Sequence, residues 1–301
     1  MSKNSRNSVP PAAYIIINIL FIFFVLVCII PFALVVSVSL TDNKALIEHG
    51  YRFIPETFSV DAYKFLFSNS RIVINAYKVT IFTTIIGTLA NVILMAMFAY
   101  PLSRYDFPFK KTFSTFVLIT MLFNAGLTPT YMVNVNILHL RNTIWALILP
   151  ALGGGFNIFV MRTYFRLNIP KEIIESTKID GASEIRIFVQ MVIPLALPVM
   201  AAIGLFNSIT FWNNWALSLY YISDTKLFSL QYVMQQALLN MQFMQQTMQA
   251  DSNTGQEMLK NLPEESVRMA MVIVGIGPIL LAYPFFQKYF VKGLTVGAVK
   301  G

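Results

Sequence analysis

The sequence predicts an all-α integral membrane protein with six transmembrane helices. Of its 301 residues, 56% are hydrophobic and only 12% are charged, whereas soluble domains carry about 25% charged residues. Several apolar stretches are long enough to cross the roughly 30 Å hydrocarbon core of a bilayer as helices. Their apolar character is continuous rather than alternating, which favours helices over the strands of a barrel.

The predicted spans are separated by polar segments of unequal length. The first span follows a basic tail, residues 1–12, and is too long for the core of a cleaved signal peptide, so we expect it to be retained. The six spans are Ala13–Leu40, Val73–Tyr100, Thr112–Val135, Thr143–Tyr164, Leu195–Tyr221 and Val267–Phe290. Residues 13–301 are expected to form a single transmembrane domain, whose outer loop covers residues 222–266.

The distribution of basic residues predicts the orientation of the spans. More than half of the 22 Lys and Arg lie on one predicted side, in the N-terminal tail, the second loop, the fourth loop and the C-terminal segment. Because cytoplasmic loops are enriched in Lys and Arg, both termini and the fourth loop are predicted to be cytoplasmic. These loops account for the net charge of +8, and nucleic-acid binding is not indicated.

The predicted spans contain no acidic residue and no histidine. All 14 Asp and Glu, together with His49 and His139, lie outside them. Ion-coupled carriers usually need ionisable groups at membrane depth, so this pattern argues against a gradient-driven carrier, although sodium sites built from backbone and hydroxyl oxygens stay open. With Cys28 as the sole cysteine, no HExxH motif and no GxxxxGK[ST] motif, we expect neither an enzyme nor a metal site. Any driven transport would take its energy from another protein.

The fourth loop, residues 165–194, is the most polar part of the middle of the chain. A proline followed by an acidic residue favours a helix start, and a helix of two turns is predicted over residues 171–179. Gly181 can adopt the positive φ that ends a helix, and Ser183 can cap a second one. Two interpretations fit this pattern: an amphipathic hairpin resting on the lipid surface, or a docking element for a cytoplasmic partner.

The stretch EIIESTKIDGASEIRIFVQMVIPLALP resembles the cytoplasmic EAA loop of ABC-importer permeases. In that loop a Glu-Ala-Ala sequence is followed by a glycine and then by an apolar element that ends in proline. Glu175-Ser176-Thr177 stands in the Glu-Ala-Ala place, Gly181 in the place of the glycine, and Val192-Ile193-Pro194 in the final element. The departures are Ser176 and Thr177 for the alanines and Ile193 for a leucine.

The resemblance covers roughly residues 13 to 301. AGLTPTYMVNVNILHLRNTIWALILP, FNIFVMRTYFRLNIP and LFNSITFWNNW are similar to carbohydrate-uptake permeases of the maltose-transporter second-subunit type, in the branch associated with oligosaccharide or polysaccharide-fragment import. This resemblance implies a type I ABC-importer permease fold in the bacterial cell membrane. It also implies a homologous second permease, a cytoplasmic ATPase dimer that binds ATP and Mg²⁺, an extracellular or periplasmic solute-binding protein, and a carbohydrate substrate.

The resemblance gives the fourth loop the role of a coupling helix. In the family, closure of the ATPases moves the docked loops and switches the spans from inward-facing to outward-facing. The EAA glutamate pairs with a basic residue of the ATPase, so Glu175 inherits that role, while Gly181 allows the turn. Ile174 and Ala182 are expected to fill a groove on the ATPase. The residues expected at this contact are Ile174, Glu175, Ser176, Thr177, Asp180, Gly181 and Ala182.

Amide and aromatic side chains around the fourth and fifth spans suggest a substrate path. Sugars are recognised by aromatic faces and by amides, and an amide in lipid costs several kcal/mol unless it faces a cavity or another helix. The candidate path residues are Asn157, Asn207, Trp212, Asn213 and Asn214. Helix packing and an interfacial aromatic belt are the alternatives, and the second permease is expected to supply much of the sugar contact.

The outer loop contains an apolar pattern that predicts one more helix. Its members step by four and three residues, as on one face of a helix: Leu230, Met234, Ala237, Met241, Met244 and Met248. This face is expected to pack against the second permease or the membrane rim, or alternatively to meet the solute-binding protein.

Three alternatives to a carbohydrate permease stay open. The first is an ABC permease for another solute, such as a peptide or a phosphonate. The second is a secondary carrier, and the third is a structural or scaffold subunit of a membrane complex. ATP-dependent uptake that survives collapse of the proton and sodium gradients would exclude the carrier.

Overall fold

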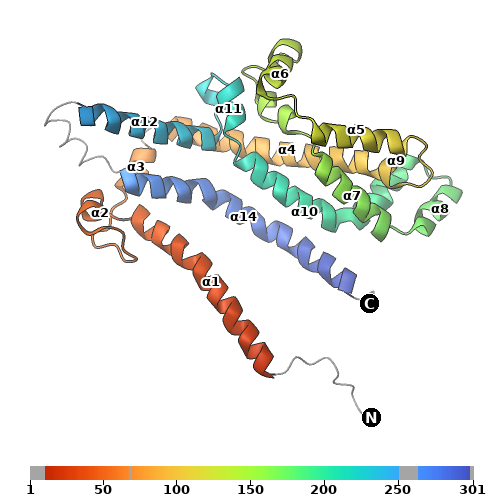
Figure 1. Ribbon diagram of the computed structural model, residues 1–301, viewed down its shortest axis with the longest axis horizontal. Coiled ribbons are helices and arrows are strands. Elements are labelled where there is room, and N and C mark those ends of the chain that lie inside the picture. The colour runs from red at the N-terminus through yellow and green to blue at the C-terminus, as the bar shows by residue number, and fades with distance from the viewer. Residues whose placement is uncertain (1–10, 68–69, 251–263, 299–301) are drawn as a thin grey trace. The chain divides into compact units, whose positions relative to one another are not determined.

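The computed structural model describes residues 11–67, 70–250 and 264–298, and its regular elements are helices (Figure 1). The chain divides into two compact units, one made of Met1–Asn69 and Leu238–Ile276, the other of Ser70–Ala237 and Gly277–Gly301. Two helices, α12 (Leu230–Ala250) and α14 (Glu264–Ala298), each pass from one unit into the other. All the residues expected at the coupling loop and along the substrate path lie in the second unit.

The first unit begins with the most apolar helix of the chain. Its elements include α1 (Pro11–Ser39), α2 (Asn43–His49) and α3 (Asp61–Leu66). The hydroxyls of Ser39, at the end of α1, and Tyr63, on α3, lie 2.9 Å apart in a hydrogen bond. Asp42 caps α2 by accepting a hydrogen bond from the backbone N–H of Lys44. These polar contacts order the segment that follows α1.

The second unit is built around three long helices that pack side by side (Figure 1). They are α4 (Ser70–Ser103), α7 (Gly155–Asn168) and α10 (Ile193–Trp212). Their shared core includes Met95 and Met161, whose side chains are fully buried. A glycine sets the distance between α4 and α10, because a Cβ on Gly87 would lie 2.6 Å from the ring of Phe211.

The number of membrane spans is only partly as predicted. Among the described residues, three helical stretches are long and apolar enough to cross a membrane: Ala12–Ser39, Arg71–Ser103 and Glu184–Trp212. Two bent pairs of helices raise the number to five if each pair is counted as one span. The predicted six are therefore not confirmed, although α14 covers the sixth predicted segment as a continuous helix.

The third predicted span is wrong as one straight helix. It consists of α5 (Lys110–Leu122), α6 (Leu127–Met132) and a π-helical turn (Val133–Ile137). The first helix and the remainder are bent by 114°. Gly126 has a φ of +81°, and its N–H donates to the side-chain oxygen of Asn124 at 2.8 Å. This turn separates α5 from α6. The backbone of Gly126 is left-handed, and its N–H bonds to a side chain instead of to a helical carbonyl.

The fourth and fifth predicted spans are interrupted as well. Two 3₁₀ turns, Ile144–Leu147 and Leu149–Ala151, precede α7 and are bent from it by 58°. The break falls at Gly153 and Gly154, whose φ values of +105° and +138° do not belong to a right-handed helix. In the fifth span α10 stops at Trp212, and α11 (Ala216–Tyr221) begins after a short break.

Candidate functional site

The predicted coupling loop forms a helical hairpin at one end of the second unit. α8 (Lys171–Ile179) confirms the predicted two-turn helix, and α9 (Glu184–Ile187) is the second arm. Ser183 caps α9, as predicted, by accepting a hydrogen bond from the backbone N–H of Arg186. A π-helical turn, Phe188–Val192, then carries α9 directly into α10.

Gly181 ends α8 in a well-defined turn. Its φ is +80°, which confirms the predicted positive value. Its N–H donates to the carbonyl of Lys178 at 3.0 Å, and the N–H of Ala182 donates to the carbonyl of Thr177 at 3.2 Å. These two bonds make a Schellman motif, the helix ending in which a left-handed glycine satisfies the last carbonyls. The turn is therefore held by the backbone itself.

A network of ion pairs and hydrogen bonds fixes the hairpin to the end of α4. Glu184 accepts hydrogen bonds from the Tyr100 hydroxyl at 2.7 Å and from the Lys178 ammonium at 2.6 Å. Asp106 accepts two hydrogen bonds from Arg104, at 2.9 and 2.8 Å, and lies 3.3 Å from the Lys178 ammonium. Arg104 also lies 3.9 Å from Glu184. Lys178 thereby joins α8 to both α9 and the loop after α4.

The charges of this network stabilise one another. Hydrogen bonds from Arg104 hold the pKa of the Asp106 carboxyl well below its usual range. The hydrogen bond to Glu184 raises the pKa of the Lys178 ammonium, and the bond to Asp106 raises the pKa of Arg104. The three groups therefore stay ionised near neutral pH, as expected where each charged form has a hydrogen-bonded partner.

The remaining carboxylates of the hairpin are exposed and unpaired. Glu172, Glu175 and Asp180 form no ion pair and no side-chain hydrogen bond with any residue in the described ranges. Glu175 lines a pocket of about 180 Å³ together with Arg166 and Lys171. Those ranges also hold no group of three or more His, Cys, Asp or Glu placed to bind a metal ion. The hairpin thus presents three exposed carboxylates that no described residue of the chain pairs.

The other residues expected at the partner contact face different ways. Ile174 is only 8% exposed and packs in the core of the second unit, and Ala182 is half-buried against the same core. Both side chains therefore contact their own chain, and the groove contact expected of them stays a prediction. The hydroxyls of Ser176 and Thr177 donate to the carbonyl of Ile173, at 3.1 and 2.6 Å. These two side chains are therefore bonded to the backbone of their own helix.

Two features of the hairpin were not predicted from the sequence. The first is the bond between Tyr100 and Glu184, which joins residues 84 positions apart and has no local signal. The second is a pair of isoleucines, Ile179 and Ile185, which are 87% and 77% exposed on either side of the Gly181 turn. Apolar residues flanking a polar turn are a signal from which such an exposed pair can be inferred.

The candidate path residues lie in different surroundings. Asn207 is buried and accepts a hydrogen bond from the Asn91 amide at 3.3 Å. Asn91 in turn accepts from the N–H of Gly153 at 2.8 Å, so this chain of amides joins α10, α4 and the break before α7. Asn157, on α7, is half-buried. These contacts give Asn207 a place in helix packing.

Asn213, Asn214 and Trp212 lie where α10 ends. The Asn214 side chain accepts a hydrogen bond from the N–H of Leu217 at 3.1 Å and so helps to start α11, while Asn213 is exposed. Trp212 is buried. It lines a largely apolar pocket of about 390 Å³ whose other members include Thr84, Thr88 and Ser208. The hydroxyls of Thr84 and Thr88 have no hydrogen-bond partner within the described part of the chain.

The chain is helical and apolar, and its polar hairpin is bonded to a long helix. Its sequence matches a known family. The sequence profile of the binding-protein-dependent transport system inner membrane component covers residues 7–296. The chain belongs to this family. The permease is therefore a multi-pass inner-membrane component of an ABC transporter, and its role is transport, not catalysis. Membership also implies an ATPase and a solute-binding protein as partners.

Individual relatives agree with this assignment over nearly the whole permease. It is 37% identical over 280 residues to the polygalacturonan/rhamnogalacturonan transport system permease protein YtcP of Bacillus subtilis, covering 93% of this chain and 95% of that protein. It is 27% identical to the arabinooligosaccharides transport system permease protein AraQ of Halalkalibacterium halodurans, covering 95% and 96% of the two chains. The predicted family is thereby confirmed.

A solved structure supports the fold. The permease resembles a chain in the crystal structure of a bacterial ABC transporter involved in the import of the acidic polysaccharide alginate, with a TM-score of 0.76 and 26% identity. The match covers 96% of this chain and 99% of the other. The all-helical permease fold of ABC importers, which the sequence predicted, is confirmed.

Proposed function

We propose that this permease passes a carbohydrate, an oligosaccharide or a polysaccharide fragment, into the bacterial cytoplasm, and that α8 receives the energy from a partner ATPase. The substrate class is supported by relatives named for the transport of polygalacturonan and rhamnogalacturonan and of arabinooligosaccharides, and by the likeness to the alginate importer. The permease itself carries out no chemistry. ATP and Mg²⁺ are bound by the ATPase.

The proposed assembly pairs this chain with a homologous second permease, two ATPase subunits and a solute-binding protein. Residues 13–301 form a single type I permease domain with six spans and both termini in the cytoplasm. Basic residues gathered at the α8 end support this orientation, since Lys and Arg are enriched on the cytoplasmic side. They are Arg104, Lys110, Lys111, Arg162, Arg166, Lys171, Lys178 and Arg186.

One observation carries the proposal: the hairpin pairs some of its charges internally and leaves others free. Glu184 is bonded to α4 and α8, whereas Glu175 is exposed and has no partner in the described ranges. A carboxylate on a rigid, exposed helix is well placed to form a charge-assisted hydrogen bond with a basic residue of another protein. Asp180, at the turn, adds a second exposed carboxylate.

The apolar part of this contact comes from residues other than Ile174. Ile179 and Ile185 are the large exposed apolar side chains next to the Gly181 turn, and they fit a hydrophobic groove on the ATPase. Ser176 and Thr177 form the smooth side of α8. The proposed docking surface therefore consists of Glu175, Ser176, Thr177, Ile179, Asp180, Gly181 and Ile185.

The bonds of the hairpin explain how its movement reaches the spans. Packed elements shift as units instead of bending continuously. Lys178, Glu184 and Tyr100 connect α8 and α9 to the end of α4, and the π-helical turn continues α9 into α10. A displacement of α8 is therefore passed to both α4 and α10, which pack together along the second unit.

The proposed substrate path runs past Trp212 and Asn213 at the end of α10. Trp212 supplies an aromatic face, and Asn213 supplies an exposed amide. Thr84 and Thr88 line the same pocket as Trp212, and their buried hydroxyls have no hydrogen-bond partner among the described residues. Asn207 and Asn214 support the path through hydrogen bonds at a helix break and a helix start, and Asn157 borders it from α7.

The docking role is tested by Glu175→Lys in the complete transporter reconstituted in proteoliposomes with its solute-binding protein. ATP-dependent uptake is expected to fall at least about tenfold, because a charge reversal replaces an attraction with a repulsion. Membrane insertion and the yield of the second permease should be unchanged. Glu48→Lys is the control, since Glu48 is an exposed acid on α2. Full co-purification of the ATPase with Glu175→Lys would contradict the docking role.

The transport class and the substrate class need separate measurements. Uptake should persist when the proton and sodium gradients are collapsed and should stop without ATP; the opposite result would indicate a secondary carrier. A glycan panel on the partner solute-binding protein tests the substrate. Binding of peptides or phosphonates and of no glycan would overturn the carbohydrate assignment while leaving the ABC mechanism intact.

A further inference from the structure

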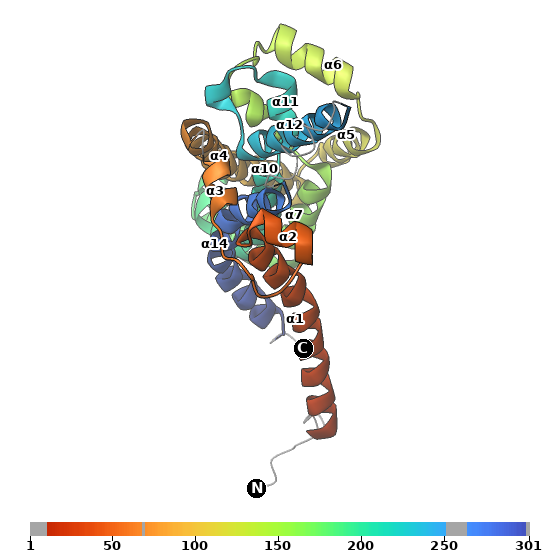
Figure 2. The ribbon, with the colours of Figure 1, turned by 90° about the vertical axis from the view of Figure 1, so that its left-hand side faces the viewer.

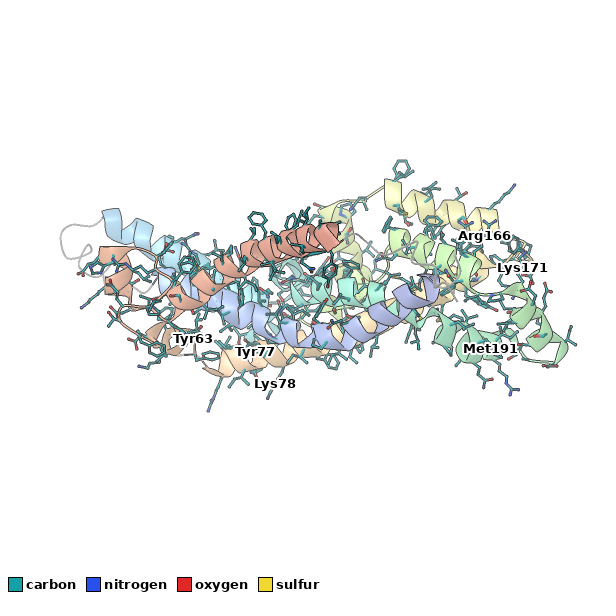
Figure 3. The ribbon with its side chains drawn as sticks, turned by 90° about the horizontal axis from the view of Figure 1, so that it is seen from below. Tyr63, Tyr77, Lys78, Arg166, Lys171 and Met191 are labelled. Atoms are coloured by element: carbon teal, nitrogen blue, oxygen red, sulfur yellow. The ribbon has the colours of Figure 1, made fainter. Side chains whose placement is uncertain are left out.

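A second cluster of charges lies beside the hairpin, where α5, α7 and α8 meet. Its centre is Tyr105, in the loop after α4, whose side chain is 57% exposed. Three cations contact its ring: the Lys171 nitrogen lies 3.7 Å from the ring centroid, the Arg166 guanidinium carbon 5.1 Å and the Lys110 nitrogen 5.3 Å. Figure 3 shows Arg166 and Lys171 close together at this end.

These cations are held in place without carboxylates. Arg166 donates to the Tyr105 hydroxyl at 3.2 Å. Lys110 donates to the backbone carbonyl of Arg104 at 3.1 Å. Arg162, one turn before Arg166 on α7, donates to the carbonyl of Leu102 at 3.1 Å. Neutral acceptors thus fix the positions of Lys110, Arg162 and Arg166 and leave their charge uncompensated.

The cluster carries an excess of positive charge. Lys110, Arg162, Arg166 and Lys171 form no ion pair with a carboxylate of the described residues. The nearby Asp106 and Glu184 are bound by Arg104 and Lys178, and Glu175 lines the adjoining pocket unpaired. Like charges within a few ångströms repel one another. Three of these cations contact the exposed Tyr105 ring and Arg162 lines the same hollow as Tyr105, so the four together form a site that favours an anion.

Two further observations describe that anion. Tyr105, Arg162, Thr163, Arg166 and Leu167 line a hollow on the surface. The hydrogen bond from Arg166 lowers the pKa of the Tyr105 hydroxyl. The two guanidiniums and the Tyr105 hydroxyl at this hollow, with Lys110 and Lys171 over the same ring, suit the several acceptor oxygens of a phosphate group.

Exposed apolar side chains border the cluster. Phe109 is 61% exposed, Phe113 43% and Leu167 75%. The cluster also lies where α5 begins and α7 ends. Each of these helices belongs to a bent pair that is long and apolar enough to cross a membrane. Such a junction falls at the depth of lipid headgroups. A phospholipid presents a phosphate and acyl chains together, whereas a free phosphate has no apolar part that could contact the exposed phenylalanines.

We propose that Lys110, Arg162, Arg166 and Lys171, arranged around Tyr105, bind the phosphate of an anionic phospholipid in the leaflet that borders the coupling hairpin. The acyl chains of this lipid lie along Phe109, Phe113 and Leu167. Since Tyr105 sits in the loop that carries Arg104 and Asp106, the bound lipid braces the base of the hairpin from the membrane side.

The test measures lipid binding to the purified transporter complex in detergent by native mass spectrometry, with phosphatidylglycerol as the probe and phosphatidylcholine as the neutral comparison. Lys110→Gln with Arg166→Gln removes two cations of the cluster. Lys111→Gln with Arg186→Gln removes two exposed cations of the same end that do not contact Tyr105. Phosphatidylglycerol affinity is expected to fall about 30-fold in the first variant and to stay within about threefold in the control.

Each other outcome points to a different explanation. An equal loss in both double variants would mean diffuse attraction to an anionic surface and would overturn the site. Displacement of the lipid by millimolar inorganic phosphate would indicate a free-anion site. Unchanged lipid affinity together with loss of the ATPase from the first variant would place the cluster in the ATPase contact. A thermal unfolding curve for each variant separates these results from misfolding.

Discussion

The two ends of the second unit are built from different chemistry. The end that contains α8 and α9 is joined by ion pairs among Arg104, Asp106, Lys178 and Glu184. The end that contains α11 is joined by neutral groups: Asn134 donates to the Tyr221 hydroxyl at 3.0 Å, and the N–H of Leu230 donates to the Thr80 hydroxyl at 2.8 Å. Figure 2 shows α6 next to α11 at this second end.

The buried polar groups at the neutral end bond to one another. Ser218 and Ser229 share a buried hydrogen bond of 2.9 Å, and the rings of Tyr131 and Tyr221 stack with centroids 5.5 Å apart. Buried polar groups that are satisfied within the chain make this part of it rigid. The charged end satisfies only some of its groups, and its free carboxylates and cations remain exposed. The contrast indicates that neutral bonds hold the framework at the α11 end, while exposed charges at the α8 end are available to the ATPase.

The largest effect on stability and coupling is expected from Glu184→Ala. The change removes the acceptor shared by Tyr100 and Lys178, and it should lower the free energy of unfolding by about 1–2 kcal/mol, since the carboxylate is half exposed. ATP hydrolysis per transported sugar should rise because the hairpin loosens from α4. Glu172→Ala is the matched control, as both acids lie in the first turn of a helix. Equal effects in the two variants would leave the network without a role.

Tyr221→Phe tests the neutral end. It deletes the hydroxyl that accepts from Asn134, whose side chain is buried, so the free energy of unfolding should fall by about 1 kcal/mol. The ratio of ATP hydrolysis to uptake should not change, because the bond between Asn134 and Tyr221 is expected to hold the framework only. Tyr220→Phe, at an exposed neighbour, is the control for stability. A change in coupling with Tyr221→Phe would remove the functional distinction between the two ends.

The smallest effect concerns pH. The pKa of Asp106 is lower in the folded protein than its unfolded value of about 4. Its ion pairs therefore contribute stability above that pH, and the contribution is lost as the pH falls through the folded pKa. The advantage of the wild type over Asp106→Asn in unfolding temperature should shrink below about pH 4. If the difference in unfolding temperature between the wild type and Asp106→Asn did not change with pH, the ion pairs of Asp106 would be contradicted.

Short-range features of the chain were predictable because their causes are local. The bounds of α8, the positive φ at Gly181 and the Ser183 cap all depend on residues within one turn of each other. The breaks at Gly126 and Gly153 also have local signals, but the apolar length of these stretches outweighed them in the prediction. A continuous apolar run indicates a membrane segment without specifying one straight helix.

The sequence by itself determined the membrane class, the helical hairpin and the family, because composition, capping residues and the loop pattern are contained in contiguous stretches. Only the tertiary structure decided which acids of the hairpin are paired and that Ile174 faces inward. Those outcomes depend on Tyr100, Arg104 and Asp106, which lie more than 70 positions from the residues they hold. Pairing over such distances is set by how α4 packs beside α8 and α9, and no local preference of the chain encodes it.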